Sequence, residues 1–78
     1  MATVRLFAAA RDAAGVGRDV IDAPTVAALL AAAVDRYGPA FAALLPSSRV
    51  WVNGDPASES TRIGAGDEVA ILPPVSGG

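Results

Sequence analysis

Hydrophobic and polar residues alternate at the start of the chain and predict its first strand. Residues 3–8 put aliphatic or small side chains on one side of an extended backbone and Arg5 and Phe7 on the other. This period of two residues is typical of a strand with one buried face. Residues 10–15 predict a short helical turn that ends at a glycine, and residues 18–23 predict a second strand that ends before a proline.

The clearest element is a helix over residues 25–37. Thr25 is a suitable N-cap, and Gly38 followed by Pro39 supplies a stop. The apolar positions between them recur at helical spacing and form one continuous stripe: Val26, Leu29, Leu30, Ala33, Val34 and Tyr37. Residues 40–45 predict one more helical turn, ended by a proline.

The second half of the chain is read as strands. Residues 48–56 run into Asn53-Gly54, the strongest short hairpin signal that a sequence offers. We expect a short edge strand within residues 57–63, and residues 64–72 predict a glycine turn followed by a final strand. One long helix among these strands predicts an α+β domain, in which one mixed sheet of four to five strands packs on one main helix.

A single main helix can cover only one face of such a sheet. If Val4, Val50 and Val69 point toward the helix, the alternate residues point away from it. The large apolar residues expected on the uncovered face are Phe7, Trp51 and Leu72. They could be isolated surface residues, which are common. Because exposed apolar clusters tend to mark binding sites, we predict instead that they form a partner-binding patch.

Composition narrows the class of protein. The chain has 78 residues, enough for one domain near the lower size limit, and its 53% hydrophobic content argues against disorder. The longest apolar run, residues 26–34, is far shorter than the roughly 20 residues of a membrane span. The apolar stretch 6–10 is also too short for a signal peptide. We therefore expect a cytoplasmic protein with no membrane partner.

Charge and side-chain chemistry leave little room for catalysis. The sequence has no histidine, cysteine or lysine; its six cations are arginines, and eight acids give a net charge of −2. We therefore expect no metal, no bound cofactor and no nucleic acid partner. Asp67 and Glu68 are neighbours on a strand and point to opposite faces, and the serines have no base beside them. Arg11 could bind an anion, although simple solvation is the more common role.

The end of the chain is the remaining candidate for chemistry. Prolines fix φ and cannot donate a backbone hydrogen bond, so Pro73 and Pro74 should end the strand and hold the tail extended. Glycines have no side chain, so a Gly-Gly tip can enter a channel too narrow for other residues. Its carboxylate becomes a good electrophile once a leaving group such as AMP is attached. We predict a domain over residues 1–72, an extended flexible tail over residues 73–78, and a protein that is a substrate for other enzymes. The tail residues are Pro73, Pro74, Val75, Ser76, Gly77 and Gly78.

Several motifs resemble one family, the small subunit of molybdopterin synthase. The ending GDEVAILPPVSGG, residues 66–78, resembles the C-terminal signature of that family. The start VRLFAAARDAAG, residues 4–15, resembles its first strand and helical turn, including the spacing of Phe7, Ala8 and Arg11. PTVAALLAAA and VNGDP fit its helix and its hairpin. The resemblance implies a ubiquitin-like β-grasp fold, which agrees with the one-sheet, one-helix prediction.

The resemblance also implies a chemistry and a set of partners. A ubiquitin-activating-type adenylyltransferase would consume ATP to adenylate Gly78, and a sulfur-donating enzyme would convert the product to a thiocarboxylate. The tail would then enter the large catalytic subunit of a heterotetramer and give its sulfur to cyclic pyranopterin monophosphate, in molybdenum cofactor biosynthesis. The chain would not be catalytic alone. The expected partner-binding face comprises Phe7, Arg11, Trp51 and Leu72, with Trp51 assigned from the alternation alone.

Three alternatives remain. A sulfur carrier for thiamine thiazole or for cysteine biosynthesis would share the fold and the Gly-Gly tip. A ubiquitin-like protein modifier would use the same terminus to attach to targets. A plain binding module would end on glycines by accident. The double proline and the Phe-Ala-x-x-Arg start favour the molybdopterin synthase subunit.

Overall fold

The computed structural model describes residues 1–74, and Val75, Ser76, Gly77 and Gly78 of the predicted tail lie outside the described residues. The elements follow in the order β1 (Ala2–Leu6), α1 (Ala8–Ala14), β2 (Arg18–Ile21), α2 (Val26–Tyr37), α3 (Pro39–Leu44), the 3-10 turn η1 (Leu45–Ser47), β3 (Arg49–Val52), β4 (Asp55–Pro56) and β5 (Glu68–Leu72). Within residues 1–74, no helix combines the length and the apolar character needed to cross a membrane.

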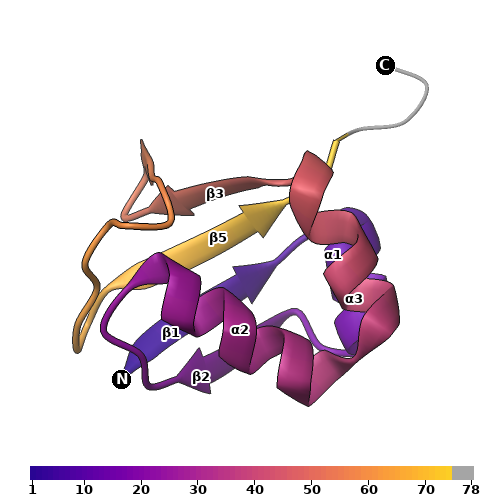
Figure 1. Cartoon of the computed structure of the whole chain (residues 1–78), viewed down its shortest axis with the longest axis horizontal. Helices are drawn as coiled ribbons and strands as arrows, with labels where there is room; N and C mark the ends of the chain where they lie inside the picture. Colours follow the sequence, from indigo (N-terminus) through magenta and orange to yellow (C-terminus); the bar gives the residue numbers. More distant parts are fainter. Residues whose placement is uncertain (75–78) are drawn as a thin grey trace.

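The strands form one five-stranded sheet in the order β2-β1-β5-β3-β4. β1 and β5 are parallel neighbours at the centre, whereas the pairs β1–β2, β3–β5 and β3–β4 are antiparallel. Figure 1 shows α2 crossing in front of the strands, with α1 and α3 beside its C-terminal end. The prediction of an α+β, ubiquitin-like β-grasp fold with a mixed sheet on one main helix is confirmed.

The core lies between the helices and one face of the sheet. Alternate strand residues are buried there, together with the apolar stripe of α2 and Phe41 of α3: Ala2, Val4, Leu6, Ile21, Val69, Ile71, Val26, Leu29, Ala33 and Phe41. Thr25 caps α2 as predicted, because its Oγ1 accepts a hydrogen bond from the Ala28 N–H at 3.2 Å. The buried strand residues all point toward the side on which the helices pack, and the opposite face of the sheet has no helix over it.

The first strand ends earlier than predicted. It stops at Leu6, and Phe7 is the N-cap of α1 rather than a strand residue. The Phe7 carbonyl accepts hydrogen bonds from the Ala10 N–H at 3.0 Å and the Arg11 N–H at 3.3 Å, which turns the chain into the helix. The predicted helical turn is therefore a full helix, and it closes at Gly15, with φ of 79°, as expected.

The edge strand expected within residues 57–63 is wrong. This segment makes one isolated bridge, between Thr25 and Arg62. Its carbonyls instead satisfy the start of α2: Thr61 accepts from the Val26 N–H at 3.0 Å and Glu59 from the Ala27 N–H at 2.9 Å. The first N–H groups of a helix have no partner within the helix, so this segment acts as a cap.

Candidate partner-binding site

The strand register defines the sheet face that no helix covers. Directly opposed residues of neighbouring strands share a face, so the pairs Trp51–Ala70 and Arg49–Leu72 belong together. Continuing this alternation across all strands gives the set that we call the open face: Arg18, Val20, Thr3, Arg5, Glu68, Ala70, Leu72, Arg49, Trp51 and Pro56. None of these residues is fully buried.

A groove lies where β5 leaves the sheet, and we call it the tail-root groove. It is a hollow of about 510 Å³ lined by Ser47, Arg49, Trp51, Leu72, Pro73 and Pro74. Pro73 is buried and Pro74 is exposed. The first proline of the predicted tail therefore packs against the fold, and the chain reaches solvent at the second.

Hydrogen bonds at the opposite end of β5 fix this strand in the sheet. The Asn53 side chain accepts from the Glu68 N–H at 2.9 Å and donates to the Asp67 carboxylate at 3.0 Å. The Gly64 N–H donates to the other Asp67 oxygen at 2.8 Å. These bonds, first from Asn53 and then from Gly64, hold the pKa of Asp67 below its usual range. These bonds therefore fix the beginning of β5, the strand that leads to the tail-root groove.

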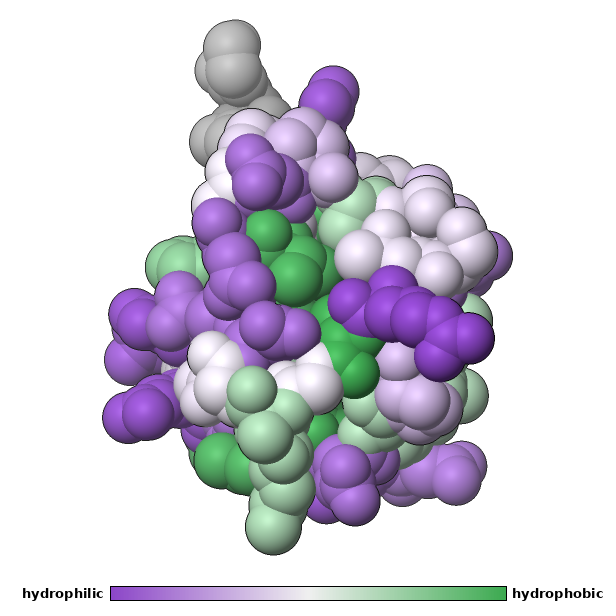
Figure 2. Space-filling view, turned by 90° about the vertical axis from the view of Figure 1, so that its left-hand side faces the viewer, coloured by the Kyte–Doolittle hydropathy of each residue, from purple (hydrophilic) through white to green (hydrophobic). Residues whose placement is uncertain are grey.

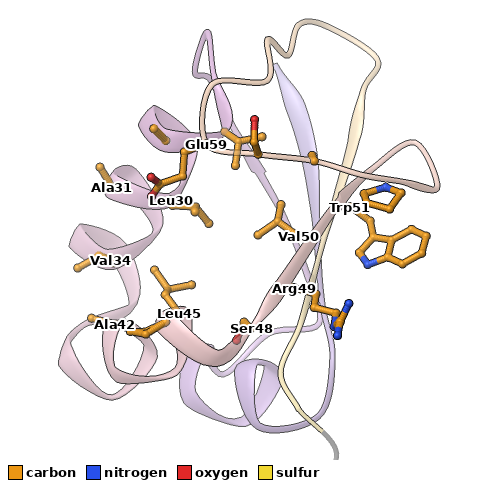
Figure 3. Close-up of a pocket in the computed structure, with 16 residues that line it drawn as sticks. Leu30, Ala31, Val34, Ala42, Leu45, Ser48, Arg49, Val50, Trp51 and Glu59 are labelled. Carbon is orange, nitrogen blue, oxygen red and sulfur yellow. The ribbon is translucent and has the colours of Figure 1, made fainter.

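A larger hollow of about 710 Å³ lies on the helix side of β3. Figure 3 shows Leu30, Leu45 and Val50 pointing into it. Arg49 and Trp51 also border this hollow, but their side chains lie on the other side of the strand. Figure 2, which shows the left-hand side of the view in Figure 1, has strongly hydrophobic surface at its centre with more hydrophilic side chains around it. Because alanine, valine and leucine dominate its lining, this hollow offers an apolar surface rather than an acid–base pair.

The structure brings together only some of the residues predicted for the site. Trp51, Leu72, Pro73 and Pro74 share the tail-root groove. Phe7 is 40% exposed and follows β1 with an extended backbone, but it does not line this groove. Arg11 lies on α1 with its side chain against Gly17, also away from the groove. The partner-binding role of all these residues stays a prediction.

Ser47 and Arg49 are the groove residues that the sequence does not single out, and Arg49 is the charged one. The signal was present, because Arg49 precedes Trp51 by two residues and must share its face in a strand. Within residues 1–74, no three acidic side chains gather in a way that could hold a metal ion. The site therefore offers apolar contact and positive charge beside the root of the tail.

Comparisons with known proteins give a consistent family. The sequence matches the ThiS family over residues 4–78. The crystal structure of SAMP1 from Haloferax volcanii is 33% identical, covers 99% of this chain and 98% of its own, and superposes with a TM-score of 0.84. The solution structure of the small archaeal modifier protein 1 from Methanosarcina acetivorans is 29% identical, with 99% and 95% covered and a TM-score of 0.89.

A third similar structure is a putative molybdopterin converting factor, subunit 1, from Pyrococcus furiosus. It is 25% identical, covers 95% of this chain and 97% of its own, and has a TM-score of 0.79. A search of curated proteins gives no match. Since the family match spans nearly the whole chain and the fold agrees with it, this chain belongs to the ThiS family of ubiquitin-like sulfur carriers.

Proposed function

We propose that this chain is the sulfur-carrying small subunit of a molybdopterin synthase. The observation that carries the proposal is the course of β5, which is held at the centre of the sheet and delivers Pro73 and Pro74 to the tail-root groove. Pro74, the last described residue, therefore has a defined position beside the open face. The resemblance of residues 66–78 and of Phe7, Ala8 and Arg11 to that subunit, together with the similarity to the Pyrococcus protein, supports this pathway over the others.

The first part of the proposed chemistry activates the terminal carboxylate. An oxygen of the Gly78 carboxylate attacks the α-phosphorus of ATP on a ubiquitin-activating-type adenylyltransferase, and pyrophosphate leaves. Hydrosulfide, delivered by a sulfur-donating enzyme, then attacks the carbonyl carbon of the acyl-adenylate. AMP leaves with the oxygen it gained, a proton is released, and a thiocarboxylate remains. ATP is consumed by the partner, and this chain supplies the acyl group.

The second part transfers the sulfur. The thiocarboxylate sulfur forms a bond to a pterin carbon of cyclic pyranopterin monophosphate, bound by the large catalytic subunit, and an oxygen substituent of the pterin leaves. Water then breaks the bond between the carbonyl carbon and sulfur, which restores the Gly78 carboxylate. A Gly-Gly tip without side chains suits this step, since it has to reach a substrate enclosed by another protein.

Intact mass measurement tests the activation step. The chain is incubated with ATP, a sulfide source and the adenylyltransferase of the same organism. We expect the mass to rise by the difference between one sulfur and one oxygen. Deletion of Gly78, or extension by one residue, should leave the melting temperature unchanged and abolish this shift. Sulfur transfer by an untrimmed extended chain would contradict the proposal.

The pathway is tested by adding the large synthase subunit and the pterin substrate to the thiocarboxylated chain. The expected result is formation of the pterin dithiolene, whose two sulfurs come from two thiocarboxylated chains, with return of the original mass. Sulfur transfer only to a thiazole precursor or to a cysteine precursor would assign the chain to one of those pathways instead.

Protein modification is the second candidate function. It is favoured by the two modifier structures, which are 33% and 29% identical to this chain. In that case the adenylated Gly78 would form an amide with a lysine amine of a target protein. Conjugates that carry a Gly-Gly remnant on target lysines, found by peptide mass spectrometry, would favour this function.

A further inference from the structure

The sequence lacks the side chains that most readily attack an activated acyl group. It has no lysine and no cysteine, and all six of its cations are arginines. A guanidinium keeps its proton at neutral pH and is not a nucleophile, whereas lysine amines and cysteine thiolates are. Because histidine is also absent, the serine and threonine hydroxyls have no imidazole base to activate them.

The single tyrosine is also held in an unreactive form. The Tyr37 hydroxyl donates a hydrogen bond to the Asp19 carboxylate at 2.6 Å. Burial and then this carboxylate raise the pKa of the phenol, so the nucleophilic phenolate is disfavoured. An acyl group activated at the end of this chain therefore has few side chains of its own to react with.

The tail-root groove shows the same property at the place where the described chain ends. Three of its lining residues carry a nitrogen or oxygen in the side chain: Ser47, Arg49 and Trp51. The Ser47 hydroxyl donates to the Leu44 carbonyl at 3.3 Å, and the indole N–H of Trp51 can only donate. The groove therefore presents positive charge and apolar surface, but no amine or thiol.

The position of Arg49 distinguishes it from the other arginines on the open face. Arg5 and Arg18 are directly opposed on β1 and β2, and the Arg5 and Glu68 side chains are 3.5 Å apart. Arg49 lies on β3 directly opposite Leu72, and its residue is exposed. Within residues 1–74, no acidic side chain forms an ion pair with Arg49. Its positive charge is therefore available to an anionic group near the groove.

The terminus is long enough to return to this charge. Directly opposed Cα atoms of an antiparallel pair are about 5 Å apart, which applies to Arg49 and Leu72. Pro74 follows Leu72 by two residues, or at most about 7 Å. Residues 75–78 span at most about 14 Å from Pro74. Gly78 can therefore approach the side chain at position 49.

We propose that Arg49 is a specificity-determining residue, which places positive charge beside the anionic tail without offering a nucleophile to the activated Gly78. The carbonyl carbon then remains available to an external nucleophile. The inference rests on the activation of Gly78, which is part of the proposed function and is shared by the protein-modifier alternative. A lysine at this position would carry the same charge, but its amine nitrogen would bond to the carbonyl carbon, AMP would leave, and the nitrogen would lose a proton. The resulting internal amide could not take up sulfur.

Arginine-to-lysine substitutions test the proposal without the adenylyltransferase. The full chain is prepared as a Gly78 thioester of 2-mercaptoethanesulfonate, by thiol cleavage of an intein fusion, so that its carbonyl is already activated. R49K is compared with R62K. Arg62 is also exposed, but it precedes β5, whose five residues separate it from the tail by about 16 Å.

The thioesters are incubated at mildly alkaline pH, where part of the lysine is neutral. A short flexible tail gives an effective concentration in the millimolar range, on the order of a thousand times that of a micromolar solution. We expect R49K to release its thiol about tenfold faster than R62K or the wild type. Its product should be one water lighter than the free acid, and peptide mass spectrometry should find an amide between the introduced lysine and Gly78.

A second variant keeps the test independent of position 49. S47K places an amine in the same groove and should also form the internal amide. If R49K and S47K keep the wild-type melting temperature and lose the thioester no faster than R62K, the inference is wrong. Rapid loss of one water from the wild-type thioester would also overturn it. If both variants form the amide but no adenylyltransferase activates the wild type, the inference stands and the proposed function fails.

Discussion

At the scale of single residues, Asp19 connects β2 to the C-terminal end of α2. Its Oδ2 accepts hydrogen bonds from the Tyr37 hydroxyl at 2.6 Å and from Arg36 Nη1 at 3.0 Å. These bonds, with that of Tyr37 the largest cause, hold the pKa of Asp19 below its ordinary value of 3.8. Burial and then the Asp19 carboxylate raise the pKa of the Tyr37 phenol. A polar cluster thus joins the edge of the sheet to the main helix.

This cluster predicts a pH-dependent contribution to stability. A carboxyl whose pKa is lowered by folding stabilises the fold above its unfolded pKa, and the contribution is lost as pH falls through the folded pKa. Replacing Tyr37 with Phe should lower the free energy of unfolding by about 1 kcal/mol at pH 7. Below pH 3.8 the difference between the two proteins should shrink. Urea unfolding at several pH values measures it; a difference that is constant with pH would contradict the assignment to Asp19.

At the scale of elements, side chains occupy the backbone groups of Val20 at the outer edge of β2. The Val20 N–H donates to Asp19 Oδ1 at 2.8 Å, and the Val20 carbonyl accepts from Arg36 Nη1 at 3.0 Å. An exposed edge strand with unsatisfied backbone groups is a template for pairing with another chain. Because Asp19 and Arg36 occupy both backbone groups of Val20, this position of the edge is not free to pair with another strand.

The β3–β4 hairpin depends on its turn residues. Asn53 and Gly54 have φ of 51° and 84°, the left-handed conformations that a two-residue hairpin turn requires. Replacing Gly54 with Ala should lower the free energy of unfolding by about 1 kcal/mol. Gly64 is the matched control, because its φ is not positive and an added Cβ would meet no atom within 4 Å. Equal melting temperatures for G54A and G64A would show that the turn does not limit stability.

Elements set by local signals could be predicted from the sequence, whereas others could not. Thr25, the apolar stripe of α2 and Asn53-Gly54 act through residues close in the chain, and the structure confirms them. The segment 57–63 was misread because its partners are the N–H groups of α2, which are distant in sequence. The early end of β1 is not visible in the sequence because the alternation of side chains continues through Phe7 and Ala8, although the alanines that follow favour a helix.

At the scale of the whole molecule, the candidate site depends on strand order. The alternation of residues predicted that Trp51 and Leu72 share a face, and the register agrees. The opposed arginines require the knowledge that β2 pairs with β1 and that β1 lies beside β5, which alternation alone does not provide. The burial of Pro73 likewise depends on how the chain packs after β5. The alternation of residues along each strand therefore predicts which face a side chain is on. Which charges lie next to each other on that face depends on the pairing of the strands.

Two neighbouring residues of β5 should separate folding from partner binding. Ile71 is fully buried on the helix side, whereas Leu72 is half-buried on the open face. Replacing Ile71 with Ala should lower the free energy of unfolding by about 3 kcal/mol, because it leaves a cavity in the core. Replacing Leu72 with Ala also removes apolar contacts, but these lie at the surface, where we expect a partner to bind.

L72A should therefore lower the free energy of unfolding by about 1 kcal/mol or less and raise KM for adenylation several-fold. I71A should leave KM unchanged at temperatures where it remains folded. Thermal unfolding and adenylation kinetics on both variants measure the two effects. If L72A loses as much stability as I71A while keeping the wild-type KM, Leu72 belongs to the core and the open face does not bind the adenylyltransferase through it. If L72A instead keeps most of its stability and raises KM, whereas I71A loses stability and keeps the wild-type KM, one face of β5 serves the fold and the other binds the partner.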